Sequence, residues 1–275
     1  MASNTSMSQT PSSAMEAPLE SKLGKISYLY RPGEPNFVFV HGLGGRKEHF
    51  SSAFDARSGL GKGVLCLDLM GFGASDRLPD DEEYLLKTQA EAMSGLLVDL
   101  GISNINLIVH SMSSGVIPSL LASGRVDVSA IYLLEGNLIE ADAGWSGTLT
   151  AMSDDEYEDY MRRVKKTARL VLSRQLVRSH SRTQVQEWSN SFQLADERAM
   201  RETARFVHQA TLGGDIARAL ADYGGPIVYI RGDADRDWPG RETLRSIDAE
   251  LVVIGDAGHY VMLDAPDEVY KTIFS

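Results

Sequence analysis

Short apolar runs alternate with longer amphipathic segments along most of this chain, and that alternation restricts its fold more than any other feature. Six runs are nearly continuous in apolar residues: 36–42, 63–69, 105–111, 129–136, 226–232 and 250–256. Such runs are typical of strands buried on both faces of a parallel sheet. A seventh run, 25–33, alternates and ends in a Pro-Gly turn, which indicates an edge strand.

The segments between these runs have helical spacing. Residues 83–100 place apolar side chains three or four positions apart and end at Gly101, a residue typical of helix C-termini. Residues 240–248 and 265–274 are also helical in pattern. Strands that alternate with helices predict an α/β fold, with a doubly wound, mostly parallel sheet and helices on both faces.

Residues 138–223 contain no such apolar run and are helical in pattern. Ser153 lies three residues before Glu156, which is a capping-box signature for a helix start. We therefore predict a helical cap at 138–223, inserted into a core made of residues 22–137 and 224–275. Residues 1–21 are polar, rich in Ser and Thr and without periodicity. We expect them to be a disordered tail, and they lack the features of a secretory signal.

The charge of the chain argues against several kinds of partner. The chain has 38 acidic and 27 basic side chains among 275 residues, a formal net charge of −11. This excess repels phosphate backbones and anionic lipids, so we expect a small-molecule substrate and neither nucleic acid nor membrane. No window approaches about 18 consecutive apolar residues, so no membrane span is predicted and a cytoplasmic location is the default.

No metal or cofactor site is predicted. The one cysteine, Cys66, excludes an internal disulfide and a multi-cysteine metal site, and its apolar surroundings indicate a buried, inert thiol. The run "DADRD" (233–237) begins like a calcium loop. Such a loop needs a glutamate twelve positions from its start, and Leu244 stands there, so we reject calcium.

Ser111 ends the apolar run "LIVHS" and is followed by the small residues "MSSG". A serine at a strand-to-helix turn is a candidate nucleophile, although the same letters also suit a serine in a polar loop. A serine nucleophile needs a base, and that base needs an orienting acid. The rest of the chain must therefore decide between the two interpretations.

His259 is the candidate base, and two carboxylates compete to orient it. Of the six histidines it alone combines a strand-end loop, a preceding glycine and a helical pattern behind it. Asp235 comes three residues after the strand-end Gly232, whereas Glu135 lies at the tip of the preceding strand. Either carboxylate can reach the same histidine. We favour Asp235 and keep Glu135 as the alternative.

The order Ser111, Asp235, His259 is accompanied by two further motifs. "HGLGG" (41–45) directly follows a predicted strand, and "DLMGFGASD" (68–76) follows the next one. With these motifs the chain resembles the α/β-hydrolase superfamily, as a serine hydrolase with a helical cap, over nearly everything after residue 22.

The resemblance implies an oxyanion hole and a turnover mechanism. The backbone N–H groups of Leu43 and Met112 would hold the oxyanion, and Ser111 would form an acyl-enzyme that water hydrolyses. The sequence departs from the family pattern G-x-S-x-G at Val109 and Ser113, so we expect a repacked turn.

The resemblance further implies an esterase-like serine hydrolase that needs no cofactor and cleaves a carboxylic ester, lactone or thioester of a small apolar molecule. The family's dehalogenases and epoxide hydrolases would need an aspartate in place of Ser111 and are disfavoured. A C–C bond hydrolase of the same fold and a receptor that binds without turnover remain as alternatives. Aromatic residues of the predicted cap suggest either an apolar acyl site or simple packing: Trp145, Tyr157, Tyr160, Trp188 and Phe192.

Overall fold

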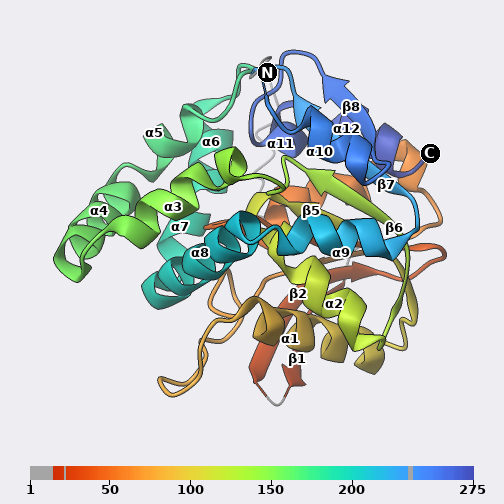
Figure 1. The fold of residues 1–275 in the computed structure, drawn as a ribbon, viewed down its shortest axis with the longest axis horizontal. Coiled ribbons are helices and arrows are strands. Elements are labelled where there is room, and N and C mark those ends of the chain that lie inside the picture. The colour runs from red at the N-terminus through yellow and green to blue at the C-terminus, as the bar shows by residue number, and fades with distance from the viewer. Residues whose placement is uncertain (1–14, 22, 235–237) are drawn as a thin grey trace, which may run out of the picture.

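The computed structural model describes residues 15–21, 23–234 and 238–275, and within them the chain folds around one eight-stranded sheet (Figure 1). The strand order is β1-β2-β4-β3-β5-β6-β7-β8. The β1–β2 and β2–β4 pairs are antiparallel, and all other pairs are parallel. The strands are β1 (Met15–Ser21), β2 (Gly24–Arg31), β3 (Asn36–Val40), β4 (Gly63–Leu67), β5 (Asn104–His110), β6 (Asp127–Leu134), β7 (Ile227–Gly232) and β8 (Glu250–Ile254).

Helices cover both faces of the sheet, which explains why its central strands are continuous apolar runs. On one face α2 (Ile117–Ser123) packs against both α1 (Leu86–Asp99) and α9 (Asp215–Tyr223) (Figure 1). On the other face α12 (Pro266–Ile273) packs against two 3-10 helices, η1 (Lys47–Phe54) and η2 (Arg57–Gly59). The short helices α10 (Arg241–Ser246) and α11 (Val261–Asp264) lie beside β7 and β8 (Figure 1).

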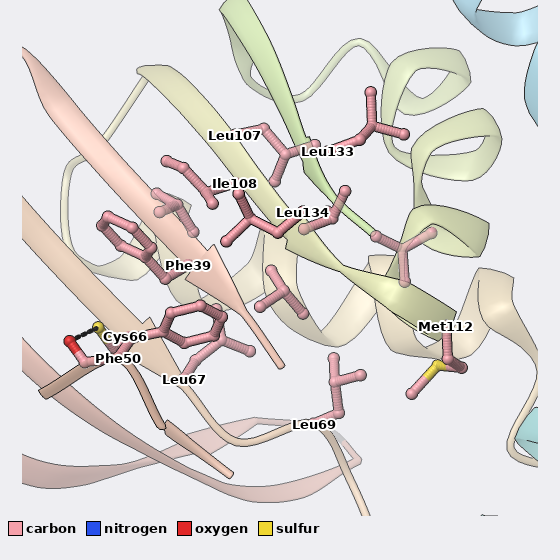
Figure 2. Packing of buried hydrophobic residues seen from close by; sticks show 14 of the residues in the cluster. Phe39, Phe50, Cys66, Leu67, Leu69, Leu107, Ile108, Met112, Leu133 and Leu134 are labelled. Carbon is pink, nitrogen blue, oxygen red and sulfur yellow. Dashed lines mark hydrogen bonds between the residues drawn. The ribbon is translucent and has the colours of Figure 1, made fainter. Parts of the chain in front are cut away.

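The core is built from side chains of neighbouring strands. Figure 2 shows Phe39, Leu67, Ile108 and Leu134 on adjacent strands within one hydrophobic cluster. Cys66 is fully buried there, and burial raises the pKa of its thiol well above the usual value. The predicted burial of this thiol is confirmed, and its raised pKa disfavours the reactive thiolate.

The predicted α/β architecture is confirmed. Each of the seven predicted runs overlaps a strand, and the helix predicted over 83–100 is α1, with Gly101 just beyond its end. Pro118 lies in the first turn of α2, where a missing backbone N–H leaves no hydrogen bond unmade.

One expectation about the N-terminal segment is corrected. Residues 15–21 were expected to belong to a disordered tail, but they form β1 and pair antiparallel with β2. The sequence "MEAPLES" alternates apolar and other residues, and the exposed edge of β2 supplies backbone hydrogen-bond partners that composition cannot reveal. Residues 1–14 lie outside the described part of the chain.

Helices fill the chain between β6 and β7, and no strand occurs among residues 135–226. These elements are η4 (Glu140–Ala143), α3 (Gly144–Ala151), α4 (Asp154–Lys166), α5 (Ala168–Ser173), α6 (Arg182–Ser189), α7 (Ser191–Leu194) and α8 (Glu197–Leu212), followed by α9. In Figure 1, α3 to α8 stand beside the sheet, whereas α9 packs against α2 of the core. We call residues 140–212 the cap; the division at 138–223 stays a prediction.

The turn after β4 braces the loop after β3. Asp68 is buried, and its carboxylate accepts the backbone N–H of Lys47 at 2.6 Å and the Lys47 ammonium at 3.1 Å. The same carboxylate accepts the N–H of Ala74 at 2.9 Å, within its own turn. Lys47 lies two residues after "HGLGG", so this buried ion pair fixes the chain just beyond that loop.

Asp68→Ala is expected to lower the free energy of unfolding by about 3 kcal/mol, because it leaves the buried Lys47 ammonium without one of its carboxylate partners. Urea denaturation measures the loss. The matched control is Asp159→Ala, which removes an exposed ion pair with Arg162 and should cost less than about 1 kcal/mol. Equal losses in the two variants would contradict a bracing role for Asp68.

Candidate active site

Ser111 lies at a sharp turn where β5 ends and the 3-10 helix η3 (Ser111–Val116) begins. Its φ of 53° falls in the left-handed region, which costs a residue with a side chain about 1–3 kcal/mol. The residue lines a cavity whose walls come from both the core and the cap. Ser111 is therefore held in a strained turn and presented to a cavity, rather than lying in a polar surface loop.

The two departures from G-x-S-x-G are accommodated by packing and hydrogen bonding. Val109 is fully buried in β5, with Val40 of β3 and Leu133 of β6 as its neighbours. The buried hydroxyl of Ser113 accepts the N–H of His110 at 2.9 Å and donates to the carbonyl oxygen of Val40 at 2.9 Å. Ser113 thus bonds the Ser111 turn to the neighbouring strand β3 through a side-chain hydrogen bond that glycine could not make.

Ser114 holds the same turn from its other side, a role that the sequence did not signal. Its hydroxyl donates to the carbonyl oxygen of Ser111 at 2.9 Å and accepts the N–H of Asn137 at 2.9 Å. The side-chain amide of Asn137 donates to the carbonyl oxygen of Asp142 at 3.2 Å. The turn is therefore connected to the segment that leads into the cap.

His259 lies in the loop after β8, and its Nε2 is 3.0 Å from Ser111 Oγ. The ring touches the cavity, but the protein around it desolvates the imidazolium and lowers the pKa of His259 to about 4. His259 is consequently neutral at pH 7 and able to accept a proton from serine. The Nε2–H of His110 donates to the carbonyl oxygen of His259 at 2.9 Å, which holds the backbone of the base.

Of the two candidate acids, the structure describes Glu135 alone. Asp235 lies outside the described residues. Glu135 stands at the tip of β6 with a φ of 48°, and its Oε1 accepts the N–H of Gly232 at 2.7 Å. Glu135 therefore links the ends of β6 and β7.

The two backbone amides expected to hold an oxyanion are those of Leu43 and Met112. Leu43 follows a glycine that touches the Ser111 turn, and Met112 follows Ser111 itself. A Cβ atom on Gly42 would lie 2.6 Å from His110 Nδ1 and 3.1 Å from Ser111 Cβ, so only glycine permits this approach. Leu43 follows Gly42 and lines the same cavity as Ser111. Met112 is the second residue of η3, where a backbone N–H has no partner within the helix.

His41 fixes the start of the loop that carries Leu43. Its Nε2 accepts the N–H of Leu69 at 3.1 Å, so the ring proton is on Nδ1, which donates to the carbonyl oxygen of Gly42 at 2.8 Å. Burial lowers the pKa of His41, which agrees with a neutral ring. The segments 41–47 and 68–76 are thus joined at two places, by His41 and by Lys47.

The cavity above Ser111 has a volume of about 400 Å³. Three of the five aromatic cap residues named from the sequence line it, namely Trp145, Tyr160 and Phe192. The indole N–H of Trp145 donates to the Tyr160 hydroxyl at 3.0 Å, and the Trp145 ring meets Phe192 edge-on. Tyr157 and Trp188 are not among the lining residues. Further lining residues, which the sequence did not signal, are His110, Asn137, Ala141, Asp142, Gly144, Ser146, Val171, Gln175 and Tyr260.

The described residues show neither a metal-binding cluster nor a membrane-spanning helix. No three His, Cys, Asp or Glu side chains gather there in a way that could hold a metal ion. No helix in the described part of the chain combines the length and the apolar character that a membrane crossing requires.

Known proteins resemble this chain in sequence and in structure. The mouse sn-1-specific diacylglycerol lipase ABHD11 is 36% identical over 107 residues, which are 38% of this chain and 34% of the mouse protein. The match thus spans about a third of the length of that curated relative. An esterase from Exiguobacterium antarcticum superposes with a TM-score of 0.77 at 19% identity, over 94% of this chain and 98% of the esterase. A thermophilic esterase from Thermogutta terrifontis gives 0.74 at 19% identity, over 94% and 97%.

At these identities the structural likeness shows the fold and nothing finer. The family itself is shown by sequence, because a model of the alpha/beta hydrolase family matches residues 37–272. That match includes the strands that carry Ser111 and His259 as well as the whole cap. The chain therefore belongs to the alpha/beta hydrolase family.

Proposed function

We propose that this hydrolase cleaves carboxylic esters through an acyl-enzyme on Ser111. The observation that carries the proposal is the 3.0 Å separation of Ser111 Oγ and His259 Nε2 beside a cavity of about 400 Å³. A neutral imidazole within hydrogen-bond reach is what a serine hydroxyl needs in order to lose its proton as it attacks.

In the first half-reaction Ser111 Oγ attacks the ester carbonyl carbon while its proton moves to His259 Nε2. The carbonyl electron pair moves onto oxygen, where the amides of Leu43 and Met112 would donate hydrogen bonds; one such donor is typically worth about 10²–10³ in rate. The bond to the alcohol oxygen then breaks, and His259 returns the proton to that oxygen. Water repeats the sequence on the acyl-enzyme, which releases the carboxylic acid and restores Ser111.

Asp235 is the proposed orienting acid. Its neighbour supports this assignment, because the N–H of Ala234 donates to the carbonyl oxygen of Ala257, two residues before His259. The chain that leads into Asp235 therefore runs beside the loop of the base. Glu135 already accepts the N–H of Gly232, so we propose that it braces the two strand tips.

The cavity supports a small and mainly apolar acyl group. Trp145, Tyr160 and Phe192 supply an aromatic wall. Among its described lining residues there is no Lys or Arg, whereas Asp142 is one of them. An anionic acyl group would find no cationic partner there. The carbonyl groups of esters, lactones and thioesters can all use the same machinery, and the names of the relatives, a diacylglycerol lipase and esterases, support the ester class.

Ser111→Ala should abolish hydrolysis of p-nitrophenyl butyrate, because no other group of the proposed mechanism can carry the acyl group. The wild-type chain should react covalently with a fluorophosphonate probe at Ser111. Ser123→Ala is the control, since that hydroxyl donates to Leu120 O, accepts the N–H of Arg125 and does not line the cavity, so activity should stay unchanged. More than a few per cent of activity in a folded Ser111→Ala variant would remove Ser111 from the mechanism. A wild-type chain that binds esters without turning them over would be a receptor.

Asp235→Asn should lower kcat by several orders of magnitude, because the amide favours the wrong imidazole tautomer; the equivalent change in a serine protease costs about 10⁴. Glu135→Gln should cost about tenfold or less, because its remaining carbonyl oxygen can still accept the N–H of Gly232. The test is the ratio of the two losses on one ester, with both variants shown to be folded. A larger loss in Glu135→Gln would transfer the role of acid to Glu135.

The value of kcat/KM should fall on the acid side of the pH profile, with a midpoint well below 6.5. Burial lowers the pKa of His259 to about 4, and below that pKa the charged imidazole cannot accept the serine proton. Above it the neutral form predominates and the rate should be flat through pH 7. The measurement is kcat/KM for an uncharged ester over the range in which the chain stays folded. A midpoint above 6.5 would contradict the conclusion that burial is the main influence on the pKa of His259.

A further inference from the structure

The carboxylate of Asp264 joins two segments that are far apart in sequence. One is the base loop, residues 255–260, which carries His259. The other is the cap strap, residues 175–180, which connects α5 to α6. Asp264 ends α11, just beyond the base loop, and is only 3% exposed.

The base loop and the cap strap both donate hydrogen bonds to this carboxylate. From the base loop, the N–H of Gly258 donates to Oδ2 at 2.8 Å. From the cap strap, the N–H of Val177 lies 3.0 Å from Oδ2, and the N–H of Arg178 lies 3.1 Å from Oδ1. The Nε2 of His180 completes the set at 2.9 Å from Oδ1. A carboxylate offers about four acceptor positions, so Asp264 is saturated by these donors.

The contact between the cap strap and the base loop extends beyond Asp264. The guanidinium of Arg178 donates to the carbonyl oxygens of Gly255 at 3.1 Å and Asp256 at 3.2 Å. A Cβ atom on Gly258 would lie 2.4 Å from the carbonyl oxygen of Gln175, so the two backbones touch. Gln175 also lines the cavity above Ser111. The cap strap therefore belongs at once to the substrate cavity and to the support of the base.

We propose that Asp264 is a positioning residue for His259. Because its carboxylate bonds both the base loop and the cap strap, the position of His259 depends on the position of the cap strap. Gly258 directly precedes His259, and its N–H is held by a buried charge whose other donors all come from the cap strap. A shift of the strap that withdraws these donors would leave the carboxylate buried and underbonded, which is costly. The carboxylate would then move, and the base loop bonded to it would lose its fixed position. This inference rests on the proposed role of His259 as base.

A purely structural role for Asp264 would change KM, kcat and the reactivity of Ser111 in a different way from a positioning role. If Asp264 only fastened the cap, its loss would loosen the cavity and raise KM, while the reaction of Ser111 with a small reagent would keep its rate. If it positions the base, kcat and the rate of that reaction should fall together. A displacement of about 1 Å can cost a reaction step about 10²-fold, so the two cases are well separated.

The experiment compares Asp264→Asn, His180→Gln, His180→Leu and the control Asp196→Asn. Gln at position 180 keeps an N–H donor toward Asp264, whereas Leu removes it. Asp196 accepts an N–H at the start of α8 and touches neither segment, so it controls for the loss of a cap carboxylate. The measurements are kcat and KM for p-nitrophenyl butyrate, the rate of Ser111 phosphonylation by diisopropyl fluorophosphate, and deuterium exchange of the base loop.

We expect Asp264→Asn to lower kcat and the phosphonylation rate by about 10- to 100-fold, with KM nearly unchanged and faster exchange in residues 255–260. His180→Leu should show the same pattern severalfold more weakly. His180→Gln and Asp196→Asn should resemble the wild type. His180→Leu keeps the test decisive should Asp264→Asn fail to fold.

A rise in KM at an unchanged phosphonylation rate would overturn the proposal, and so would exchange in the base loop that no Asp264 or His180 variant alters. Wild-type protein that the reagent leaves unlabelled at Ser111 would instead overturn the proposed function. Deuterium exchange needs no turnover, so it would still show whether Asp264 couples the cap strap to the base loop.

Discussion

Ser111 holds a left-handed backbone conformation, and the active site depends on the contacts that keep it there. A φ of 53° is costly for serine, so the turn must be fixed by its surroundings. The hydroxyls of Ser113 and Ser114 do this by bonding the turn to β3 and to the segment after β6. Only with the turn so fixed can Ser111 Oγ meet His259 Nε2 at 3.0 Å.

Buried polar groups place the loops of the site, whereas the apolar core places the strands. Asp68 holds the chain just after "HGLGG" through Lys47, and Asp264 holds the base loop together with the cap strap. Both carboxylates are buried, and each is bonded by several N–H donors from different segments. Because an underbonded buried carboxylate is costly, each of these links is made completely or lost with a large penalty. Loops fixed in this way present preorganised groups to a substrate.

The strands, α1 and the capping box of α4 could be predicted because their signals are local. Apolar runs, Gly101 and the Ser153–Glu156 pair each act within a few residues of their own position. Ser111 and His259 could be paired in advance because each follows a predicted strand. The bonds of Asp264 to Val177 and of Ser114 to Asn137 join distant segments and leave no such pattern. The pairing of β1 was missed because backbone partners, and not composition, decide it.

The account's central claim is that the acyl group passes through Ser111, and trapping that intermediate tests it most directly. The chain would be mixed with p-nitrophenyl butyrate, quenched in acid within the first turnover and digested for mass spectrometry. The account predicts a butyryl group on the peptide that contains Ser111, and its absence from the same peptide of Ser111→Ala. Ester consumed with no acyl group on Ser111, or with the group on another residue, would contradict the account.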